Sequence, residues 1–583
     1  MSDIVADRPS TPQGSRGSLL VASGIALSRV AGLLREIILA AFLGSGPAVD
    51  AFTAASRIPN ALQNLLGEGV LSASFIPSYS RLLAEGRPRD AGKVASTILT
   101  LLMLVTGLLV VLGVVAAGPI TSLIAPGLLG ENRELTVTLV SIITPGIGLL
   151  VASAWCLGVL NSHRRFFLSY VAPVLWNLAQ IIALAGAGLL VFTDADVIDP
   201  SVIISGDARG LVLTLGWATV VGSALQLGIQ LPEVRRLEPN LRPSLRLDPE
   251  TLTVLQRFLP IVGARGVVQI SAYIDTALAT YLVGGGLASF RYASVLYLLP
   301  ISIFGMSIAA SELPELSSQT GRGDAAEAAR AISVRLHTGL SRIAYFVVPT
   351  SIAFIAAGDL IVGGLLQRGQ FVRSDTLQVW AIIGTYALGL LAATVSRLLQ
   401  SALYGLGDTR TPARASLIRV GVAVAVGVIL MFQLDRVGIG ADGLAVVGDL
   451  PAFGPVSETI RAAADAVPRI GAAGLSLGVS VAAWVELHLL RTRLSRIIGP
   501  IDITGGVRDQ TLGAALAAVG TTFAVRLLAG GLPQLLLSAL TLSLAAIVYL
   551  LVSKQLGFPL ARALSGHPPD RSASARRSRR GGP

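Results

Sequence analysis

Long apolar runs recur along almost the whole chain, and they restrict the fold more than any other feature. A helix needs about 20 apolar residues to cross the hydrocarbon core of a bilayer. Only 14% of the residues are charged, well below the roughly 25% of soluble domains. The sequence therefore predicts an all-α polytopic membrane protein with about 14 transmembrane helices. The expected spans lie near residues 17–43, 51–80, 94–117, 135–160, 168–192, 210–232, 256–283, 287–317, 340–365, 376–404, 412–432, 470–490, 510–530 and 534–553.

Basic residues collect in every second loop. Arg81 and Arg87 follow the second expected span, and Arg164 and Arg165 follow the fourth. The loops between are neutral or acidic, as in residues 44–50, and the weakest case is the 366–375 loop with Arg368 and Arg373. Because positive charge is retained in cytoplasmic loops, this alternation predicts an even number of spans with both termini in the cytoplasm. It also explains the net charge of +11 without nucleic acid as a partner.

Charged residues interrupt the first two spans and give the strongest functional signal. An Arg or Asp at mid-bilayer costs about 2.5–3.5 kcal/mol, so such residues face protein or water. Arg29 and Arg35 lie about 240° apart on a helix and can both line a broad cavity. A cationic cavity implies an anionic cargo. The alternative is buried ion pairs that fix helix packing, for example Arg35 with Glu68, and N-capping competes as a role for Asp50.

Several other classes of function are excluded or disfavoured. The single Cys156 rules out an intrachain disulfide and a thiolate metal cluster. The four His residues are scattered without metal-ligand spacing, so no metal site is expected. Phosphate-binding and hydrolase motifs are lacking, so we expect neither an enzyme nor a catalytic residue. Transport would then draw on an ion gradient, the membrane potential or the cargo gradient.

Short motifs along most of the membrane region carry a family resemblance. They are SRVAGLLRE at 28–36, DAF at 50–52, PN at 59–60, GEGVLSASFIPSYS at 67–80, LNSHRRFFLSYVAPVLWN at 160–177, LLQRGQF at 365–371, YGLGDTRTP at 404–412 and GAAGLSLG at 471–478. In their order and spacing the chain resembles the MurJ/MviN lipid II flippases. This family belongs to the multidrug/oligosaccharidyl-lipid/polysaccharide exporter superfamily.

The resemblance implies two six-helix bundles around a central cavity, followed by two extra C-terminal helices. The implied parts are a cytoplasmic N-terminal segment at 1–16, an N-terminal bundle at 17–232, a cytoplasmic linker at 233–255, a C-terminal bundle at 256–490, the extra helices at 491–560 and a disordered basic cytoplasmic tail at 561–583. Within the second bundle, residues 433–469 form an outside loop that is either a small lid or a flexible insertion.

The resemblance also implies roles for the charged residues. Arg29 and Arg35 fall on the family's essential cavity arginines, which bind the diphosphate of the cargo. The gating or ion-pair candidates are Asp50, Glu68, Glu36 and Arg57. This sequence departs from the family at Gln63, where many relatives have a basic residue, and at Val295, where the family has an Arg. Arg265 and Arg291 are the substitutes that we expect at the substrate site.

Asp275 is the candidate for ion coupling. A lone carboxylate inside a span is too costly to be incidental, and some relatives have a sodium site in the second bundle. A salt bridge to another helix is the alternative. Arg265 lies about 15 Å away along one helix, so a pair within that helix is impossible. No cofactor is expected, and Na⁺, H⁺ or the membrane potential is the coupling force.

The function implied by the resemblance is alternating-access transport of lipid II, the undecaprenyl-diphosphate-linked peptidoglycan precursor. The cargo would move from the inner to the outer leaflet of the bacterial cytoplasmic membrane. Gln63 and Val295 make another polyprenyl-linked oligosaccharide, or export of a small molecule, the nearest alternative. A non-transporting scaffold for cell-wall synthesis is the second. Expected partners are the glycolipid, membrane lipids and proteins of cell-wall synthesis.

Overall fold

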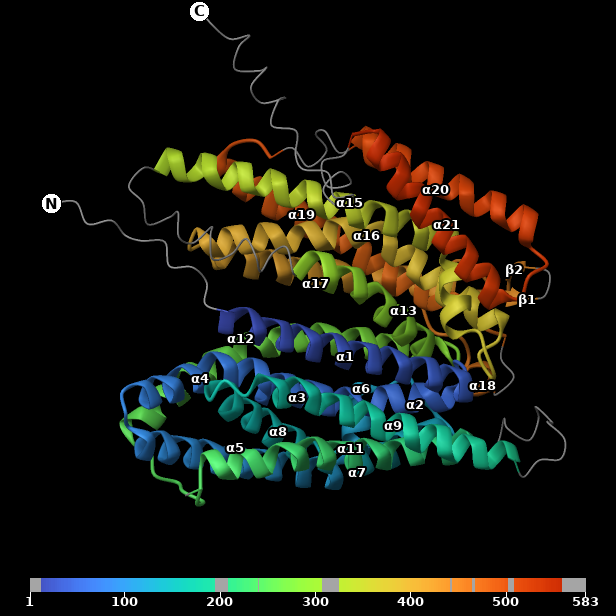
Figure 1. The fold of residues 1–583 in the computed structure, drawn as a ribbon. Coiled ribbons are helices and arrows are strands. Elements are labelled where there is room, and N and C mark those ends of the chain that lie inside the picture. Colours follow the sequence, from blue (N-terminus) through green and yellow to red (C-terminus); the bar gives the residue numbers. More distant parts are fainter. Residues whose placement is uncertain are drawn as a thin grey trace, which may run out of the picture. The chain divides into compact units, whose positions relative to one another are not determined.

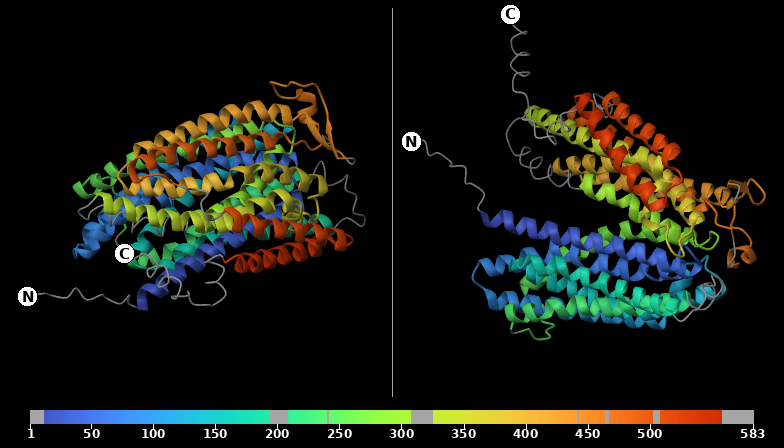
Figure 2. Two further views of the ribbon diagram at one scale, coloured as in Figure 1. Left: turned by 90° about the horizontal axis from the view of Figure 1, so that it is seen from above. Right: turned by 45° about the vertical axis from the view of Figure 1, so that its right-hand side comes forward.

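The computed structural model describes residues 12–193, 208–239, 241–306, 325–440, 443–463, 467–501 and 508–557, and these are almost entirely helical (Figure 1). The chain divides into two compact units. Unit 1 comprises Met1–Ala288, Arg368–Phe371 and Ser457–Ala466, and unit 2 comprises Ser289–Gln367, Val372–Val456 and Val467–Pro583. Within each unit the long helices run side by side (Figure 2).

Unit 1 begins with one long helix and three short ones. Helix α1 (Pro12–Leu43) covers the first expected span. The second expected span is divided into α2 (Pro47–Ala55), α3 (Arg57–Leu66) and α4 (Glu68–Ala84). Gly67 separates α3 from α4 with extended backbone angles, φ −92° and ψ −150°. A Cβ atom at Gly67 would lie 2.1 Å from the carbonyl oxygen of Gln63, so this break requires glycine.

Unit 1 continues with further helices. They are α5 (Pro88–Val115), α6 (Ala117–Ile124), α7 (Gly130–Ile143), α8 (Pro145–Ser162), α9 (Phe166–Thr193), α11 (Ala208–Leu237), α12 (Pro249–Ala279) and the short α18 (Glu458–Ala462). Helix α8 packs against α4, α5 and α11, and both α11 and α1 pack against α9. Gly222 allows α11 to approach the backbone of α9, since a Cβ atom there would lie 2.9 Å from the carbonyl oxygen of Trp176. Small residues serve the same purpose at many membrane-helix interfaces.

Two short segments from later in the chain belong to unit 1. The backbone N–H of Gln370 donates to the carbonyl oxygen of Ala41 over 2.8 Å. Gly369 has φ +57°, and a Cβ atom there would lie 2.2 Å from the same oxygen. The LLQRGQF motif is thus explained by a turn that packs closely on α1. In the other segment, Arg461 donates to the carbonyl oxygen of Gly127 over 3.0 Å.

Unit 2 is built on closely packed helices. Its elements are most of α13 (Gly286–Pro300), the π-helical η2 (Ile301–Met306), α15 (Ala325–Leu366), α16 (Arg373–Gly405), α17 (Arg410–Leu434), α19 (Gly471–Ile498), α20 (Arg508–Ala529) and α21 (Gln534–Gln555). Helix α19 packs against both α16 and α17. Gly474 allows this contact, because a Cβ atom there would lie 2.4 Å from the backbone nitrogen of Met431. Helix α15 is kinked at Ala357, where φ is −134°.

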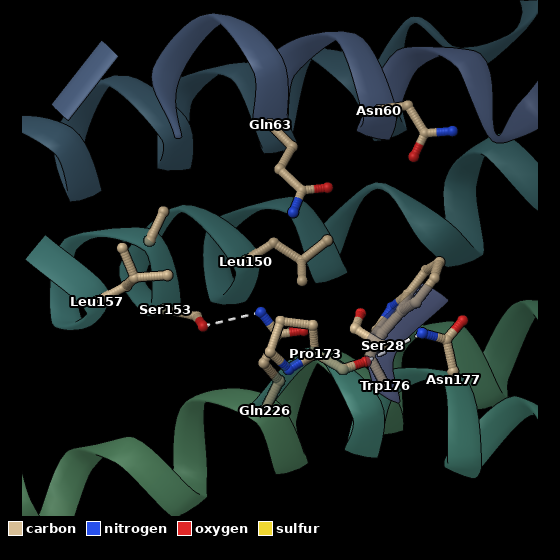
Figure 3. Close-up of a pocket in the computed structure, with 11 residues that line it drawn as sticks. Ser28, Asn60, Gln63, Leu150, Ser153, Leu157, Pro173, Trp176, Asn177 and Gln226 are labelled. Atoms are coloured by element: carbon tan, nitrogen blue, oxygen red, sulfur yellow. Dashed lines mark hydrogen bonds between the residues drawn. The ribbon is translucent and has the colours of Figure 1, made fainter. Parts of the chain in front are cut away.

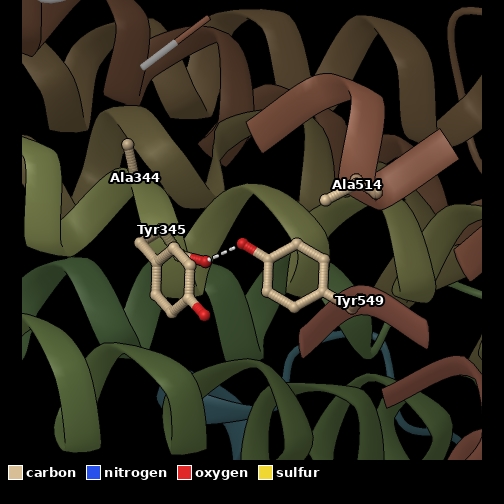
Figure 4. Packing of buried hydrophobic residues seen from close by; sticks show 5 residues of the cluster. Ala344, Tyr345, Ala514 and Tyr549 are labelled. Atoms are coloured by element: carbon tan, nitrogen blue, oxygen red, sulfur yellow. Dashed lines mark hydrogen bonds between the residues drawn. The ribbon is translucent and has the colours of Figure 1, made fainter. Parts of the chain in front are cut away.

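Helices α20 and α21 pack on α15. Figure 4 shows one contact, in which the hydroxyl of Tyr549 donates to the carbonyl oxygen of Tyr345 over 2.6 Å. The hydroxyl of Tyr345 lies 3.1 Å from that of Ser553. At a second contact, Asp359 of α15 forms an ion pair with Arg526 of α20. The two C-terminal helices are therefore fixed to unit 2 by hydrogen bonds as well as apolar packing.

The loop between α17 and α19, which we expected on the outer side of the membrane, contains the only strands in the described part of the chain. Strand β1 (Val437–Gly440) pairs antiparallel with β2 (Gly443–Val446), and Gly440 lies opposite Gly443 at the turn. The isolated bridge between Gly438 and Arg469 closes the loop onto the start of α19. The expected all-α fold is thus correct for the membrane region, and the loop adds a small hairpin to it.

Eleven helices in the described residues are long and apolar enough to cross a membrane. The chain is therefore a multi-pass membrane protein. Helices α1 and α12, and the group α2 to α4, occupy the three other ranges in which we expected spans. The count of fourteen is not confirmed and stays a prediction, as do the boundaries of the two bundles. Helix α12, which we expected to open the second bundle, lies in unit 1.

Candidate functional site

A polar cavity of about 240 Å³ lies inside unit 1, among helices α1, α3, α8, α9 and α11 (Figure 3). Its polar lining comes from Ser28, Asn60, Gln63, Ser153, Trp176, Asn177 and Gln226. Leu, Ala and Pro side chains complete the wall. None of the eleven described residues that line it carries a charge. The cavity is far larger than the ~10–15 Å³ that one water molecule needs.

Hydrogen bonds hold two amide side chains of the cavity wall, Gln226 and Asn177, in place. Ser153 of α8 is 1% exposed, and its hydroxyl oxygen accepts from Gln226 Nε2 over 3.0 Å and from Gln230 Nε2 over 2.9 Å. Gln226 and Gln230 are four residues apart and therefore share one face of α11. Asn177 of α9 donates to the carbonyl oxygen of Pro173 over 3.1 Å. These bonds fix the amides on the cavity wall before any ligand binds.

Trp176 is the lining residue with an unused donor. Within the part of the chain that the structure describes, its buried Nε1–H has no hydrogen-bond partner. A buried donor without an acceptor costs about 1–3 kcal/mol. The ring also forms part of the cavity wall.

Arg35 lies beside the cavity. Its guanidinium carbon is 5.0 Å from the centroid of the Trp176 ring, which is within the range of a cation–π interaction. Its Nη2 is 2.5 Å from Oε1 of the buried Glu36. The predicted alternative partner was Glu68, whose side chain lies outside the described structure. Arg35 thus adds one positive charge next to a neutral cavity.

The other charged residues of the first two spans occupy separate places. Arg29 is exposed on α1, directly after Ser28 of the cavity wall. Arg57 is the first residue of α3 and is half-buried. Arg35 contacts the wall of the cavity through the Trp176 ring.

Asp50 is buried in α2, where its carboxylate binds backbone amides. It accepts from the N–H of Gly285 over 2.7 Å and from the N–H of Ala288 over 2.6 Å. The N-cap of α2 is Gly46, so Asp50 does not cap its own helix. It holds the segment that begins α13, which fits the predicted gating or ion-pair role only as a structural anchor.

The substitute arginines belong to different units. Arg265 of α12 is exposed in unit 1, and a Cβ atom built on Gly69 would lie 2.3 Å from its guanidinium nitrogens. Arg265 therefore covers Gly69 at the start of α4. Arg291 is half-buried and belongs to unit 2. Asp275, the ion-coupling candidate, is half-buried on α12.

The sequence reasoning missed the amide-lined cavity. Its signal was visible as Asn and Gln residues inside apolar runs, at Asn177 and at Gln226 with Gln230. We also left Glu486 without a role. It is 4% exposed in unit 2, accepts from Gln400 Nε2 over 3.0 Å and from Ser416 over 3.1 Å, and lies 3.4 Å from Arg419 Nε.

Comparisons with known structures identify the fold. The chain is similar to a structure described as "Lipid II flippase MurJ, inward closed conformation", with a TM-score of 0.70, 20% identity, and coverage of 93% of this chain and 100% of the other. It is also similar to an inward-facing MATE family transporter of the MOP superfamily, with a TM-score of 0.59, 16% identity, and coverage of 82% and 98%. The chain therefore has the fold of these helical membrane proteins, with a polar cavity inside unit 1.

Sequence comparisons give the family. The sequence model for "Lipid II flippase MurJ" matches residues 39–449. A probable lipid II flippase MurJ of Rhizobium tropici is 31% identical over 421 residues, which cover 71% of this chain and 74% of the relative. The lipid II flippase MurJ of Burkholderia cenocepacia is 29% identical over 519 residues, which cover 86% and 88%. The chain belongs to the MurJ family, and the family predicted from the motifs is confirmed.

Proposed function

We propose that this protein is an alternating-access flippase that moves lipid II from the inner to the outer leaflet of the bacterial cytoplasmic membrane. Both termini lie in the cytoplasm in this proposal. The protein acts as a transporter and performs no catalysis. Family membership supports the transport class, and one observation carries the choice of cargo: Arg35 lies within the membrane-helix bundle beside a polar cavity.

The chemistry of the cargo explains why an arginine lies beside the cavity. A diphosphate offers paired anionic oxygens, and a guanidinium group binds such oxygens with two parallel hydrogen bonds. Arg35 is 15% exposed, so it is shielded from bulk water yet reachable. Arg29 follows Ser28 of the cavity wall on the same helix and provides the second positive charge. Arg265 and Arg291 stay candidates for the remaining contacts.

The ion pair between Arg35 and Glu36 suggests how binding and release alternate. While Glu36 occupies the guanidinium, the site is neutral overall and a diphosphate must compete for it. A cargo phosphate that displaces Glu36 would leave a buried carboxylate, which favours a change of conformation or of protonation. The same ion pair supports a purely structural role for Arg35, and the experiment below separates the two.

Energy for the cycle comes from outside the protein in this proposal. Asp275 is the candidate ligand for a coupling Na⁺ or H⁺. The membrane potential supplies about 2.3 kcal/mol per charge and 100 mV. A second cargo class, another polyprenyl-linked oligosaccharide, is favoured by one observation: Gln63 lines the cavity with a neutral amide, where the family resemblance implied a basic residue.

Complementation tests the function. The chain is expressed in a cell depleted of its own lipid II flippase, and growth and outer-leaflet lipid II are measured. We expect the native chain to restore both. Arg35→Ala should abolish rescue, since each lost charged hydrogen bond of about 1.5–3 kcal/mol weakens binding by about 10- to 150-fold. Arg35→Lys should rescue partly, because a lysine keeps the charge but loses the planar fork.

Two controls separate cargo binding from packing. Arg236→Ala removes an arginine that is 81% exposed, and it should rescue like the native chain. The double variant Arg35→Ala/Glu36→Gln removes the stranded carboxylate. If the double variant restores growth, Arg35 only balances Glu36 and does not bind cargo. Absence of rescue by the native chain, despite normal membrane insertion, would contradict lipid II as the cargo.

A further inference from the structure

The loop that follows α17 exposes an unusual set of apolar side chains. Its apolar segment, residues 444–453, reads LAVVGDLPAF and contains a single charged residue. Phe453 is 76% exposed and Leu450 is 52% exposed. Strand β2 adds the exposed side chains of Leu444 and Val446. Large apolar residues that gather on an exposed surface mark a place of interaction, because water is a poor neighbour for them.

The exposed side chains are not needed for the core of the loop. Ile439, Ala452 and Val456 are buried and fill that role. The loop is also closed by hydrogen bonds, since the guanidinium of Arg469 donates to the carbonyl oxygen of Asp435 over 2.8 Å. The loop therefore folds with one set of apolar residues inside and a second set outside, and the second set is available for another surface.

The apolar segment is tied back to the end of α17. The side chain of Gln433 bonds to the backbone of Ala452 twice: its Nε2 donates to the carbonyl oxygen over 2.5 Å, and its Oε1 accepts from the N–H over 3.1 Å. Nη2 of Arg436 donates to the carbonyl oxygen of Gly454 over 3.2 Å. Phe453 lies between these two attachment points, so it is held level with the last turn of α17.

The last turn of α17 lies at the membrane surface. The helix is apolar enough to cross a membrane, and its 25 residues extend over about 37 Å, compared with about 30 Å for the hydrocarbon core. Arg410 begins the helix and lies in one headgroup layer, so the last turn reaches the opposite layer. Gln433 shares a helix face with Ile429, an exposed apolar residue of the span. The attachment at Gln433 is therefore on a side of α17 that suits contact with lipid.

We propose that the apolar segment inserts into the headgroup layer of the bilayer beside the end of α17, with Phe453 as its main anchor. Phe and Leu side chains are typical of segments that bind at this layer. The isolated bridge between Gly438 and Arg469 joins the hairpin to the start of α19. Insertion therefore holds the ends of both α17 and α19 at the membrane surface, whatever the cargo is.

A protein strand added to the free edge of β2 is the alternative occupant. Strand β2 has four residues, and in the described part of the chain it pairs with β1 alone. An added strand would cover the strand residues Leu444 and Val446. It would leave Leu450 and Phe453 in water, because both lie beyond the strand. A lipid surface covers all four side chains without a matched shape, so we favour lipid.

Fluorescence quenching of the full chain in lipid nanodiscs tests the placement. The single native cysteine, Cys156, is buried, so a cysteine introduced at an exposed position is the accessible thiol and carries the fluorophore. Leu450→Cys is the test variant and leaves Phe453 in place. Leu104→Cys on α5 is the control inside the span, and Arg236→Cys is the control in water. The quenchers are iodide in water and lipids with a nitroxide either near the headgroup or deep in the acyl chain.

We expect the label at position 450 to lose most fluorescence to the headgroup-level nitroxide, less to the deep nitroxide and little to iodide. The reason is that interfacial segments lie about 5–10 Å into the boundary between headgroups and acyl chains. The label at position 104 should respond most to the deep nitroxide, and the label at position 236 should respond mainly to iodide.

A second substitution tests whether the aromatic ring holds the segment in place. With the label at position 450, Phe453→Ser should raise quenching by iodide about threefold, because the segment loses its largest apolar contact with lipid. Asp449→Asn is the matched control, since Asp449 is an exposed residue of the same segment. It should not raise quenching by iodide. Both changes replace exposed side chains, so the fold should be retained.

Three results would overturn the proposal. Iodide quenching as strong at position 450 as at position 236 would show that the segment lies in water. Protection from iodide without quenching by either lipid would show that protein covers it, and protection that requires two chains in one nanodisc would identify that protein as a second copy. Equal responses of Phe453→Ser and Asp449→Asn would show that the ring does not anchor the segment.

Discussion

Units 1 and 2 both bury polar side chains among membrane helices, but they satisfy them in different ways. In unit 2, the carboxylate of Glu486 accepts from Gln400 and Ser416 and pairs with Arg419. In unit 1, the amides and Trp176 surround a cavity, and the Nε1–H of Trp176 is unused. Burial of a polar residue thus does not identify a binding site. The two places differ in that the polar groups of unit 1 border a cavity, whereas Glu486 is enclosed by its partners.

This comparison predicts that substitutions in the two units lower the free energy of unfolding by different amounts. Glu486→Ala should lower the free energy of unfolding by about 2–3 kcal/mol, because Gln400 and Ser416 lose their acceptor and Arg419 loses its ion-pair partner. The value is below that of a fully buried pair because the Arg419 side chain is 35% exposed. Gln226→Leu should cost less than about 1 kcal/mol, because Gln230 still bonds to Ser153. Denaturant titration of the purified variants in detergent measures both.

A double variant sharpens the test. Glu486→Leu/Arg419→Leu removes both charges together, and replacement of an ion pair by apolar side chains is often neutral. Stability should therefore return toward that of the native chain. A Glu486→Ala variant as stable as Gln226→Leu would show that the polar cluster of unit 2 is not structural, and the contrast between the units would be lost.

A substitution at Gly69 in unit 1 should have a moderate effect on binding of the cargo. An alanine there would place a methyl group where the Arg265 guanidinium now lies, 2.3 Å from its nitrogens. If Arg265 contacts the cargo, Gly69→Ala and Arg265→Ala should weaken binding of the diphosphate lipid to a similar extent, by about three- to tenfold. Binding in nanodiscs measures this. Stability should not fall, because alanine is favoured over glycine in a helix by up to about 1 kcal/mol.

Gly107→Ala is the control for this substitution. A Cβ atom at Gly107 of α5 meets nothing within 4 Å, so binding should stay at the native level. Undiminished binding in both Arg265→Ala and Gly69→Ala would remove Arg265 from the site. The positive charge missing at Gln63 would then have no substitute in unit 1.

The smallest predicted effect is on the stability of the turn between α16 and α17 in unit 2, which lies outside the membrane spans. Asp408 accepts from the backbone N–H and the hydroxyl of Thr411 over 3.0 and 2.7 Å, and Arg493 lies 3.1 Å away. The hydrogen bonds from Thr411, with a smaller contribution from Arg493, lower the pKa of Asp408 from 3.8 to about 2. The ionised form therefore stabilises the folded turn above pH 3.8, and this contribution disappears as the pH falls to about 2.

The matched variant is Asp408→Asn. Its unfolding midpoint should lie slightly below that of the native chain at pH 6, and the gap should close between pH 3.8 and about 2. Thermal unfolding in detergent over that range measures the gap. A constant gap across the range would show that the charge of Asp408 contributes nothing to the turn.

Much of the fold could be predicted because apolar length and loop charge are local properties. The run that becomes α19 is uniform enough to mark a helix without tertiary information. The second span was harder, because its break depends on how closely the backbone at Gly67 approaches Gln63. The hairpin at residues 437–446 was not predicted, since its short, glycine-rich strands resemble a flexible loop.

The candidate site could be predicted only in part. Arg35 was recognisable because a charge inside an apolar helix is costly. Its neighbours were not, because Trp176 and Gln226 reach the cavity from separate helices whose packing the sequence does not reveal. The ion pair with Glu36 was likewise not the one we expected, since adjacent residues on a helix do not usually face each other.

Photo-crosslinking tests most directly whether the cavity beside Arg35 receives the cargo. A photoreactive amino acid replaces Gln63 in one variant and Leu104, which is 56% exposed on α5, in the other. Each is illuminated with a lipid diphosphate that carries a radiolabelled disaccharide. The account predicts strong labelling at position 63, competed by unlabelled glycolipid, and weak labelling at position 104. Equal labelling at both positions, in a chain that still rescues growth, would contradict it.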